Sequence, residues 1–196
     1  MEEKELDALR EQLLYHQKHG YDLINVDERI KLEEYCTAYK AYLNAARTER
    51  EAVAEAISQA EALGFVPYER GMVLEPGTKV YKSVRGKALL LAVMGRETLD
   101  KGANIAAAHV DSPRLDLKPL PLYEKDEICL FKTHYYGGIK KYQWVAIPLE
   151  LHGVVTKKDG ETVEVVIGKD PDDPKFTITD LLPHLAKDQM AKHGSD

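Results

Sequence analysis

The sequence predicts an α/β protein, a mixed sheet flanked by helices, followed by a second region that is rich in β-strands. Helical spacing of apolar residues dominates the first third of the chain. Two short, continuous apolar runs follow Gly64, and alternating strand patterns separated by turns take over from Leu115. These changes of pattern divide the chain into a predicted α/β part, residues 1–114, and a predicted β-rich part, residues 115–196.

Three helices are predicted before Gly64. The first carries leucines at helical spacing over residues 6–13 and is expected to end at Gly20, a natural C-terminal stop. The second is expected to start near Asp27, and its apolar side chains drift around one face. The apolar stripes of these helices are interpreted as core rather than as a cofactor-binding surface.

The third helix has the clearest predicted boundaries. Thr48 is followed three residues later by Glu51, which fits a capping box at a helix N-terminus. Apolar residues recur at helical spacing from Val53 to Leu63, and Gly64 is expected to end the helix.

The segment after Gly64 predicts strands. Residues 78–84 alternate like a half-exposed strand, and residues 85–87 suit a tight turn. The apolar runs 88–94 and 103–108 are expected to be strands buried on both faces of a central sheet. The second run leads directly into His109.

The β-rich region contains a predicted hairpin. Residues 149–156 and 161–167 are expected to pair, with Asp159-Gly160 forming a type I′ turn between them. The acidic loop 170–174 is interpreted as a solvated turn rather than a calcium site, because it lacks the glycine and the distal glutamate of an EF-hand.

Composition excludes several classes of protein. Hydrophobic residues make up 44% of the chain and charged residues 31%, as in an ordinary globular protein. The net charge of −6, with both signs interleaved, argues against nucleic-acid binding. No apolar run approaches the roughly 20 residues of a membrane span. The charged N-terminus and the irregularly placed Cys36 and Cys129 indicate a cytoplasmic protein without a disulfide framework.

The strongest chemical signal is the histidine that follows the second apolar run. Ligands gather outside the carboxyl ends of strands in open α/β sheets, so His109 is well placed for function. A neutral imidazole is a good zinc ligand, and Asp111, two residues on, lies on the same side of an extended chain and can support it. A histidine followed by Asp at this spacing is also common as a purely structural feature, and the residues alone leave both readings open.

The longer string around this histidine resembles a known family. Residues 108–119, AHVDSPRLDLKP, resemble the signature of the M18 family, the aspartyl aminopeptidase-like metallopeptidases. Three further segments also match: TERE at 48–51, YYGG at 135–138 and LPHLA at 182–186. The resemblance covers residues 27–190.

The resemblance implies a zinc-peptidase-type sheet, incomplete in this chain, and an inserted β-rich assembly domain. By that resemblance, His109 binds one of two Zn²⁺ ions, and Asp111 orients or tunes the site. The implied reaction removes N-terminal amino acids from peptides, and the inserted domain joins subunits into a homo-oligomer. His184 is implied to reach a neighbouring subunit's active site, although a capping or packing role also suits it.

The sequence departs from the family pattern after the inserted domain. The further zinc ligands and the glutamate general base lie downstream in the family, so the chain is expected to represent an N-terminal portion. His152, in an alternating strand, is interpreted as a sheet residue rather than a ligand. Two alternatives stay open: a non-catalytic assembly module with a vestigial metal site, and a histidine-based metal binder without peptidase activity.

Overall fold

A computed structural model describes residues 3–15 and 17–193 of the chain. The chain divides into two compact units, Met1–Asn44 and Ala45–Asp196. The predicted division between residues 114 and 115 falls inside the second unit and stays a prediction.

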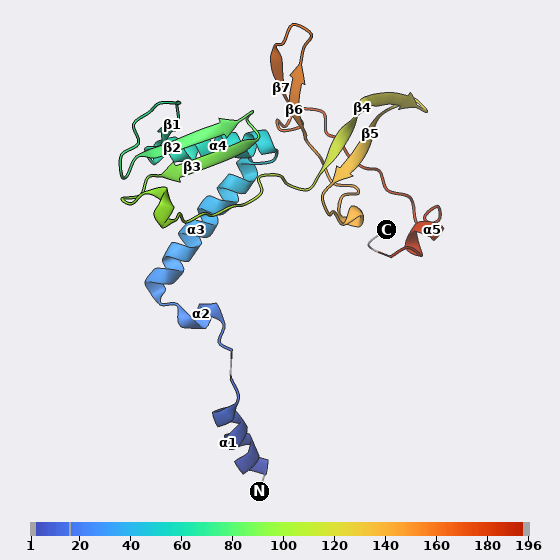
Figure 1. The fold of residues 1–196 in the computed structure, drawn as a ribbon. Helices are drawn as coiled ribbons and strands as arrows, with labels where there is room; N and C mark the ends of the chain where they lie inside the picture. Colours follow the sequence, from blue (N-terminus) through green and yellow to red (C-terminus); the bar gives the residue numbers. More distant parts are fainter. Residues whose placement is uncertain (1–2, 16, 194–196) are drawn as a thin grey trace. The chain divides into compact units, whose positions relative to one another are not determined.

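The first unit is helical (Figure 1). It contains α1 (Glu3–Leu13), α2 (Gly20–Leu23) and nearly all of α3 (Val26–Ala45). The prediction that Gly20 ends the first helix is wrong, since α1 ends at Leu13 and Gly20 opens α2. An isolated helix of 11 residues is only marginally stable in water. Without packing partners, nothing stabilises further turns between Leu13 and Gly20.

The apolar stripe of α3 does not form a core among the described residues. None of the α3 residues is buried. Tyr35 is 71% exposed and Ile30 is 53% exposed. The predicted helix is confirmed near Asp27, whereas the interpretation of its stripe as core is wrong, because the stripe lies open to solvent.

Helix α4 (Glu49–Ala62) confirms the predicted capping box. The Thr48 hydroxyl accepts a hydrogen bond from the Glu51 backbone N–H, and the Glu51 carboxylate accepts one from the Thr48 backbone N–H. These bonds satisfy backbone donors that the first helical turn leaves without partners. The helix ends as predicted, with Gly64 in the left-handed region at φ 84°.

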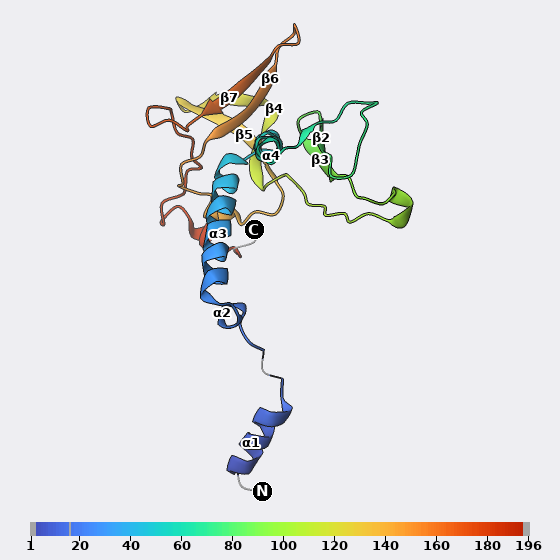
Figure 2. The same ribbon diagram turned by 90° about the vertical axis from the view of Figure 1, so that its left-hand side faces the viewer.

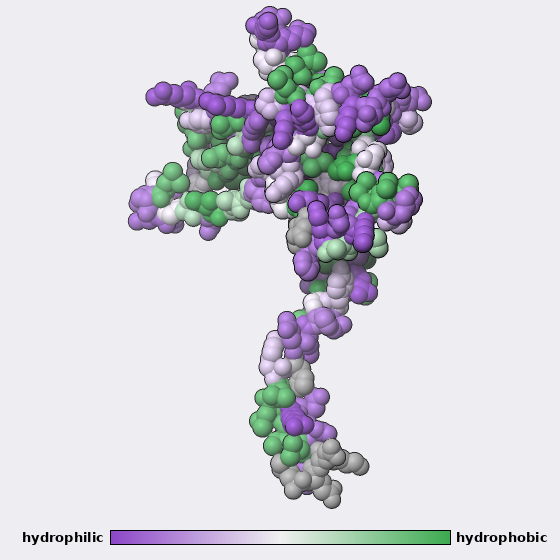
Figure 3. All heavy atoms as spheres, turned by 90° about the vertical axis from the view of Figure 1, so that its right-hand side faces the viewer, coloured by the Kyte–Doolittle hydropathy of each residue, from purple (hydrophilic) through white to green (hydrophobic). Residues whose placement is uncertain are grey.

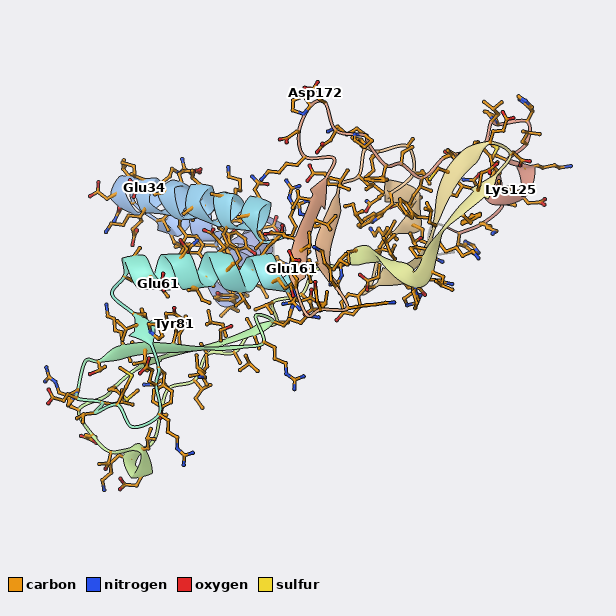
Figure 4. All side chains as sticks on the ribbon, turned by 90° about the horizontal axis from the view of Figure 1, so that it is seen from above. Glu34, Glu61, Tyr81, Lys125, Glu161 and Asp172 are labelled. Atoms are coloured by element: carbon orange, nitrogen blue, oxygen red, sulfur yellow. The ribbon has the colours of Figure 1, made fainter. Side chains whose placement is uncertain are left out.

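A small three-stranded sheet packs on α4 (Figures 1 and 4). Its order is β1 (Val66–Pro67), β2 (Lys79–Val84) and β3 (Ala88–Val93), with β1 parallel and β3 antiparallel to β2. The tight turn between β2 and β3 is confirmed, and Arg85 and Gly86 both have positive φ, as in a type I′ turn. Tyr81 donates a hydrogen bond of 2.6 Å to Glu61, which ties β2 to α4.

The core of the second unit lies between α4 and this sheet. Its buried apolar side chains include Ala52, Val53, Ala60 and Val80. The sheet is only partly covered, with Leu90, on the same face as Val80, 61% exposed and Val93, on the opposite face, 58% exposed. The prediction that residues 88–94 form a strand is confirmed, whereas its burial on both faces is wrong for the described chain, because α4 covers one face only.

The rest of the second unit consists of two hairpins, short helices and loops (Figures 1 and 2). Strands β4 (Arg114–Lys125) and β5 (Ile128–Tyr136) pair antiparallel, as do β6 (Leu151–Thr156) and β7 (Thr162–Ile167). The short helices are the 3₁₀ turns η1 (Leu99–Lys101) and η2 (Lys141–Gln143), and α5 (Lys187–Met190).

The β4–β5 ladder is interrupted in its middle. The register shifts between Leu117 and Leu122, and the intervening segment contains Pro119 and Pro121. Proline has no N–H to donate to a ladder, so the two prolines explain the break in pairing.

The β6–β7 hairpin is confirmed, but its turn differs from the prediction. Only Gly160 of the predicted Asp-Gly pair has a positive φ, of 89°, and its N–H donates to the Lys157 carbonyl. This is a type I turn followed by a left-handed glycine, the arrangement of a G1 bulge. A type I′ turn would need positive φ at Asp159 as well, so that prediction is wrong.

The acidic loop after β7 is held by one aspartate. The Asp173 carboxylate accepts hydrogen bonds from the backbone N–H groups of Gly168, at 2.9 Å, and Asp170, at 3.2 Å. These bonds, the one from Gly168 being the larger cause, lower the pKa of Asp173 below its ordinary value. Asp172, at the tip of the same loop, points to solvent (Figure 4).

Among the described residues, no helix combines the length and the apolar composition that crossing a membrane requires. Cys36 and Cys129 are both free thiols. Many apolar side chains reach the surface, where Figure 3 shows them in green.

Replacing Thr48 with Ala is expected to lower the free energy of unfolding by about 1 kcal/mol, because a cap acceptor is lost. Thr48→Ser keeps the hydroxyl and serves as the matched control. Denaturant unfolding measures both variants, and an Ala variant as stable as the Ser variant would contradict the capping role.

Acid is expected to remove the contribution of Asp173. A folded-state pKa below the ordinary 3.8 stabilises the loop above that pH, and this stabilisation is lost as the pH falls through the folded value. Asp173→Asn should therefore unfold at a lower temperature than wild type near neutral pH, with the difference shrinking below pH 3.8. Asp172→Asn is the control, and a difference between Asp173→Asn and wild type that is independent of pH would refute the argument.

Candidate functional site

The segment that leads into the predicted zinc ligand is not a strand. Residues 103–113 adopt neither helix nor strand, and Ile105 is 87% exposed. The expectation of a buried strand over residues 103–108 is therefore wrong for this chain. Its apolar side chains find no neighbouring strand among the described residues, and the ladder begins only at Arg114.

His109 and Asp111 nevertheless lie together, as predicted. The Nδ1 atom of His109 is 2.8 Å from the Asp111 backbone oxygen and 3.2 Å from the carboxylate atom Oδ1. The His109 side chain is 81% exposed. Since Nδ1 faces Asp111, the other ring nitrogen, Nε2, is the one left for a ligand.

Tyr136 holds the second oxygen of Asp111. Its hydroxyl donates a hydrogen bond of 2.9 Å to Oδ2. This bond is the main cause that lowers the pKa of Asp111 and, because it stabilises the protonated phenol, raises the pKa of Tyr136. The sequence singled out the segment containing Tyr136 only as a family match and gave this side chain no role.

Arg114 connects this pair to the rest of the second unit. Its guanidinium donates to Asp116 at 2.7 Å and to Glu49 at 3.0 Å, and lies 4.2 Å from the centre of the Tyr136 ring. It also donates to the Ser112 carbonyl at 3.3 Å. A planar group with five donors suits such a junction, which a lysine ammonium could not reproduce.

Gly137 brings the backbone after β5 close to Pro113. Its φ is 74°, a left-handed value that favours glycine, and an added Cβ would lie 3.5 Å from Pro113. The turn after β5 therefore packs directly against the segment that carries His109 and Asp111.

His184 lies apart from these contacts. It is exposed in a turn where the Leu185 N–H donates to the Leu182 carbonyl, and Ala186, two residues on, is buried. In the described residues, no hydrogen bond or ion pair joins His184 to His109 or Asp111. Its predicted role stays a prediction.

A second charged cluster anchors the β6–β7 hairpin to the first turn of α4. His152, whose side chain is only 10% exposed, places Nδ1 2.7 Å from Glu51 and Nε2 2.8 Å from Glu150. Arg47 also contacts Glu150. His152 is a sheet residue as predicted, but its hydrogen-bond contacts with partners up to 101 residues away could not be read from the sequence.

A cavity of about 340 Å³ lies beside Arg114, between the start of α4 and strands β4, β6 and β7. Its walls include Arg50, Lys87, Leu117 and His152. Neither His109 nor Asp111 lines it, so the cavity and the predicted metal ligand are separate features.

Comparison with known proteins identifies the family. A family model described as "Aminopeptidase I zinc metalloprotease (M18)" matches residues 42–196. The chain belongs to the M18 family. The family description names zinc, and the matched residues contain all the site residues described above.

Relatives within the M18 family are similar along most of this chain. A probable M18 family aminopeptidase 1 from Clostridium acetobutylicum is 44% identical over 187 residues, covering 93% of this chain and 40% of the relative. A protein of the same description from Thermotoga neapolitana is 50% identical over 160 residues, covering 82% of this chain and 35% of the relative. The chain thus spans about 40% or less of the length of these relatives.

A solved structure supports the fold. The crystal structure of an M18 family aminopeptidase from Thermotoga maritima matches with a TM-score of 0.81 at 42% identity. The match covers 93% of this chain and 40% of that one. The mixed helices and small sheets of this chain are therefore those of an M18 protein.

The site fits zinc in part. His109 has the form of a supported metal ligand, with Nδ1 held by the backbone oxygen and carboxylate of Asp111 and Nε2 left to bind. Among residues 3–15 and 17–193, however, no group of three or more His, Cys, Asp or Glu side chains is arranged to hold a metal. Catalytic zinc takes three protein ligands, so these residues supply one ligand and its support rather than a complete site.

Replacing His152 with Leu is expected to lower the free energy of unfolding by about 1–3 kcal/mol, because Glu51 and Glu150 would each lose one hydrogen-bond partner at a largely buried contact. His134→Leu is the control, since His134 is exposed on β5 and should change stability by less than about 0.5 kcal/mol. Denaturant unfolding compares the two. Equal stability of both variants would mean that the His152 cluster contributes nothing.

Proposed function

We propose that this chain is part of a zinc-dependent aminopeptidase that removes N-terminal amino acids from peptides. The observation that carries the proposal is His109, supported by Asp111 and located within the residues that match the M18 family. The relatives are described as probable aminopeptidases, and that activity is extended to this protein as part of the proposal.

In this proposal, His109 binds one of two Zn²⁺ ions through Nε2. Asp111 accepts from Nδ1 and so fixes the tautomer and the direction of the ring. Zinc would lower the pKa of bound water and polarise the peptide carbonyl. Since no group of three or more potential ligands is assembled among the described residues, the proposal takes the remaining ligands and the general base from the rest of the complete protein.

We also propose self-association through the region 115–196. Apolar side chains in the break and in the outer half of the β4–β5 hairpin are open to solvent, with Leu120, in the break, 86% exposed and Ile128 58% exposed. Exposed apolar surface of this kind favours contact with another chain. The exposed position of His184 makes it available for its proposed role in a neighbouring subunit's active site.

The proposed partners are peptide substrates and further copies of this chain, without nucleic acid or membrane. The net charge of −6 disfavours binding to the phosphate backbone. A cytoplasmic location is part of the proposal, and the free thiols of Cys36 and Cys129 suit a reducing compartment.

His109→Ala in the complete protein is expected to lower zinc content and aminopeptidase activity together. The loss should exceed the roughly 10- to 100-fold change that follows removal of a supporting residue, because a direct ligand is removed. Elemental analysis and release of an N-terminal residue from a peptide measure the two effects. Circular dichroism is expected to show an unchanged fold.

His19→Ala is the control for this experiment, since His19 is exposed and lies outside the family match. Zinc content and activity of His109→Ala equal to those of the control would show that His109 is only structural. A complete wild-type protein that assembles but has no peptidase activity would instead favour the non-catalytic assembly module.

A further inference from the structure

The hydroxyl of Tyr136 has a specific position relative to the predicted zinc ligand. It donates to Asp111 Oδ2, while Oδ1 of the same carboxylate lies 3.2 Å from His109 Nδ1 and the Asp111 backbone oxygen lies nearer to that nitrogen, at 2.8 Å. The three side chains therefore form a continuous series, from phenol through carboxylate to imidazole. Each of the two carboxylate oxygens faces one partner.

The segment that carries His109 needs such a support. Residues 103–113 have no ladder to fix their direction, and the His109 ring is largely exposed. A histidine on such an irregular segment can change the direction of its ring. This weakens metal binding unless contacts from supporting residues hold the ring. In the described residues, the His109 ring makes its polar contacts with Asp111, so its direction depends on how firmly Asp111 is held.

Tyr136 is itself firmly placed. It is the last residue of β5 and pairs with Arg114 of β4, whose guanidinium lies on its ring. Ion pairs from Arg114 to Asp116 and Glu49 fix that guanidinium in turn. The left-handed Gly137 then brings the turn after β5 against Pro113.

We propose that Tyr136 is a positioning residue for the zinc ligand, holding Asp111 so that its backbone oxygen and carboxylate keep Nδ1 of His109 engaged and leave Nε2 for the metal. The proposal rests on the proposed function and deepens it. Tyr136 belongs to the predicted β-rich region, so that region takes part in building the metal site of its own chain as well as in the proposed assembly.

The test uses Tyr136→Phe in the complete enzyme. This variant keeps the ring against Arg114 and removes only the hydroxyl. Chelator competition is expected to show zinc affinity about 10- to 100-fold weaker, as for loss of an outer-shell partner. The absorption spectrum of the cobalt-substituted enzyme should change, and added zinc should restore most of kcat with little change in KM.

Tyr135→Phe is the matched control. Tyr135 is the preceding residue of the same strand, and its hydroxyl makes no hydrogen bond within the described chain. Its zinc affinity and cobalt spectrum should equal those of wild type. A Tyr136→Phe enzyme that also matches wild type in both, while His109→Ala loses zinc, would overturn the positioning role and leave the proposed function standing.

A double variant separates positioning from general destabilisation. If the hydroxyl acts through Asp111, then Tyr136→Phe combined with Asp111→Asn should bind zinc no more weakly than Asp111→Asn alone. Additive losses would overturn the proposal, because they would mean that Tyr136 acts by another route. Retention of zinc and activity in His109→Ala would instead refute the proposed function itself.

Discussion

The arrangement of the second unit around the predicted site depends on the guanidinium of Arg114. One planar group binds the first turn of α4 through Glu49, its own strand through Asp116 and the end of β5 through the Tyr136 ring. The side chains of its ion-pair partners, Glu49 and Asp116, are 22% and 41% exposed. Water therefore screens these contacts only in part. Among the described contacts, Arg114 is the group that joins α4, the β4–β5 hairpin and the segment carrying His109 at a single point.

Local patterns predicted the local structure well. The capping box at Thr48 and Glu51 and the glycine stop at Gly64 depend on neighbours within a few residues, and both are confirmed. The same holds for the tight turn at Arg85-Gly86 and for the alternation in β7. Residues within a few positions of one another determine such features, so one segment of sequence contains the needed information.

The predictions that failed concern structures that need a distant partner, such as a neighbouring strand or a second layer on a sheet. The local sequence pattern does not show whether that partner is present. An apolar run such as residues 103–108 becomes a strand only when another strand accepts its hydrogen bonds, and no described strand does so. Burial of residues 88–94 on both faces likewise needs a second layer. Asp159-Gly160 shows a subtler limit, since the same two residues suit both a type I′ turn and a G1 bulge. The roles of Arg114, Tyr136 and His152 were missed because their partners lie 25 to 101 residues away.

The interrupted register of β4 has a mechanical consequence. Between Leu117 and Leu122 the two prolines leave the β4–β5 ladder without continuous hydrogen bonds, so the hairpin is two short ribbons in series. The inner ribbon carries Arg114 and Tyr136, and the outer one carries the exposed Leu122 and Ile128 beside the charged turn 124–127. The hairpin can bend at this break in its hydrogen bonding. A displacement of the outer ribbon is therefore only weakly transmitted to the inner ribbon. A partner that binds the outer end of the hairpin should therefore displace the residues around His109 very little.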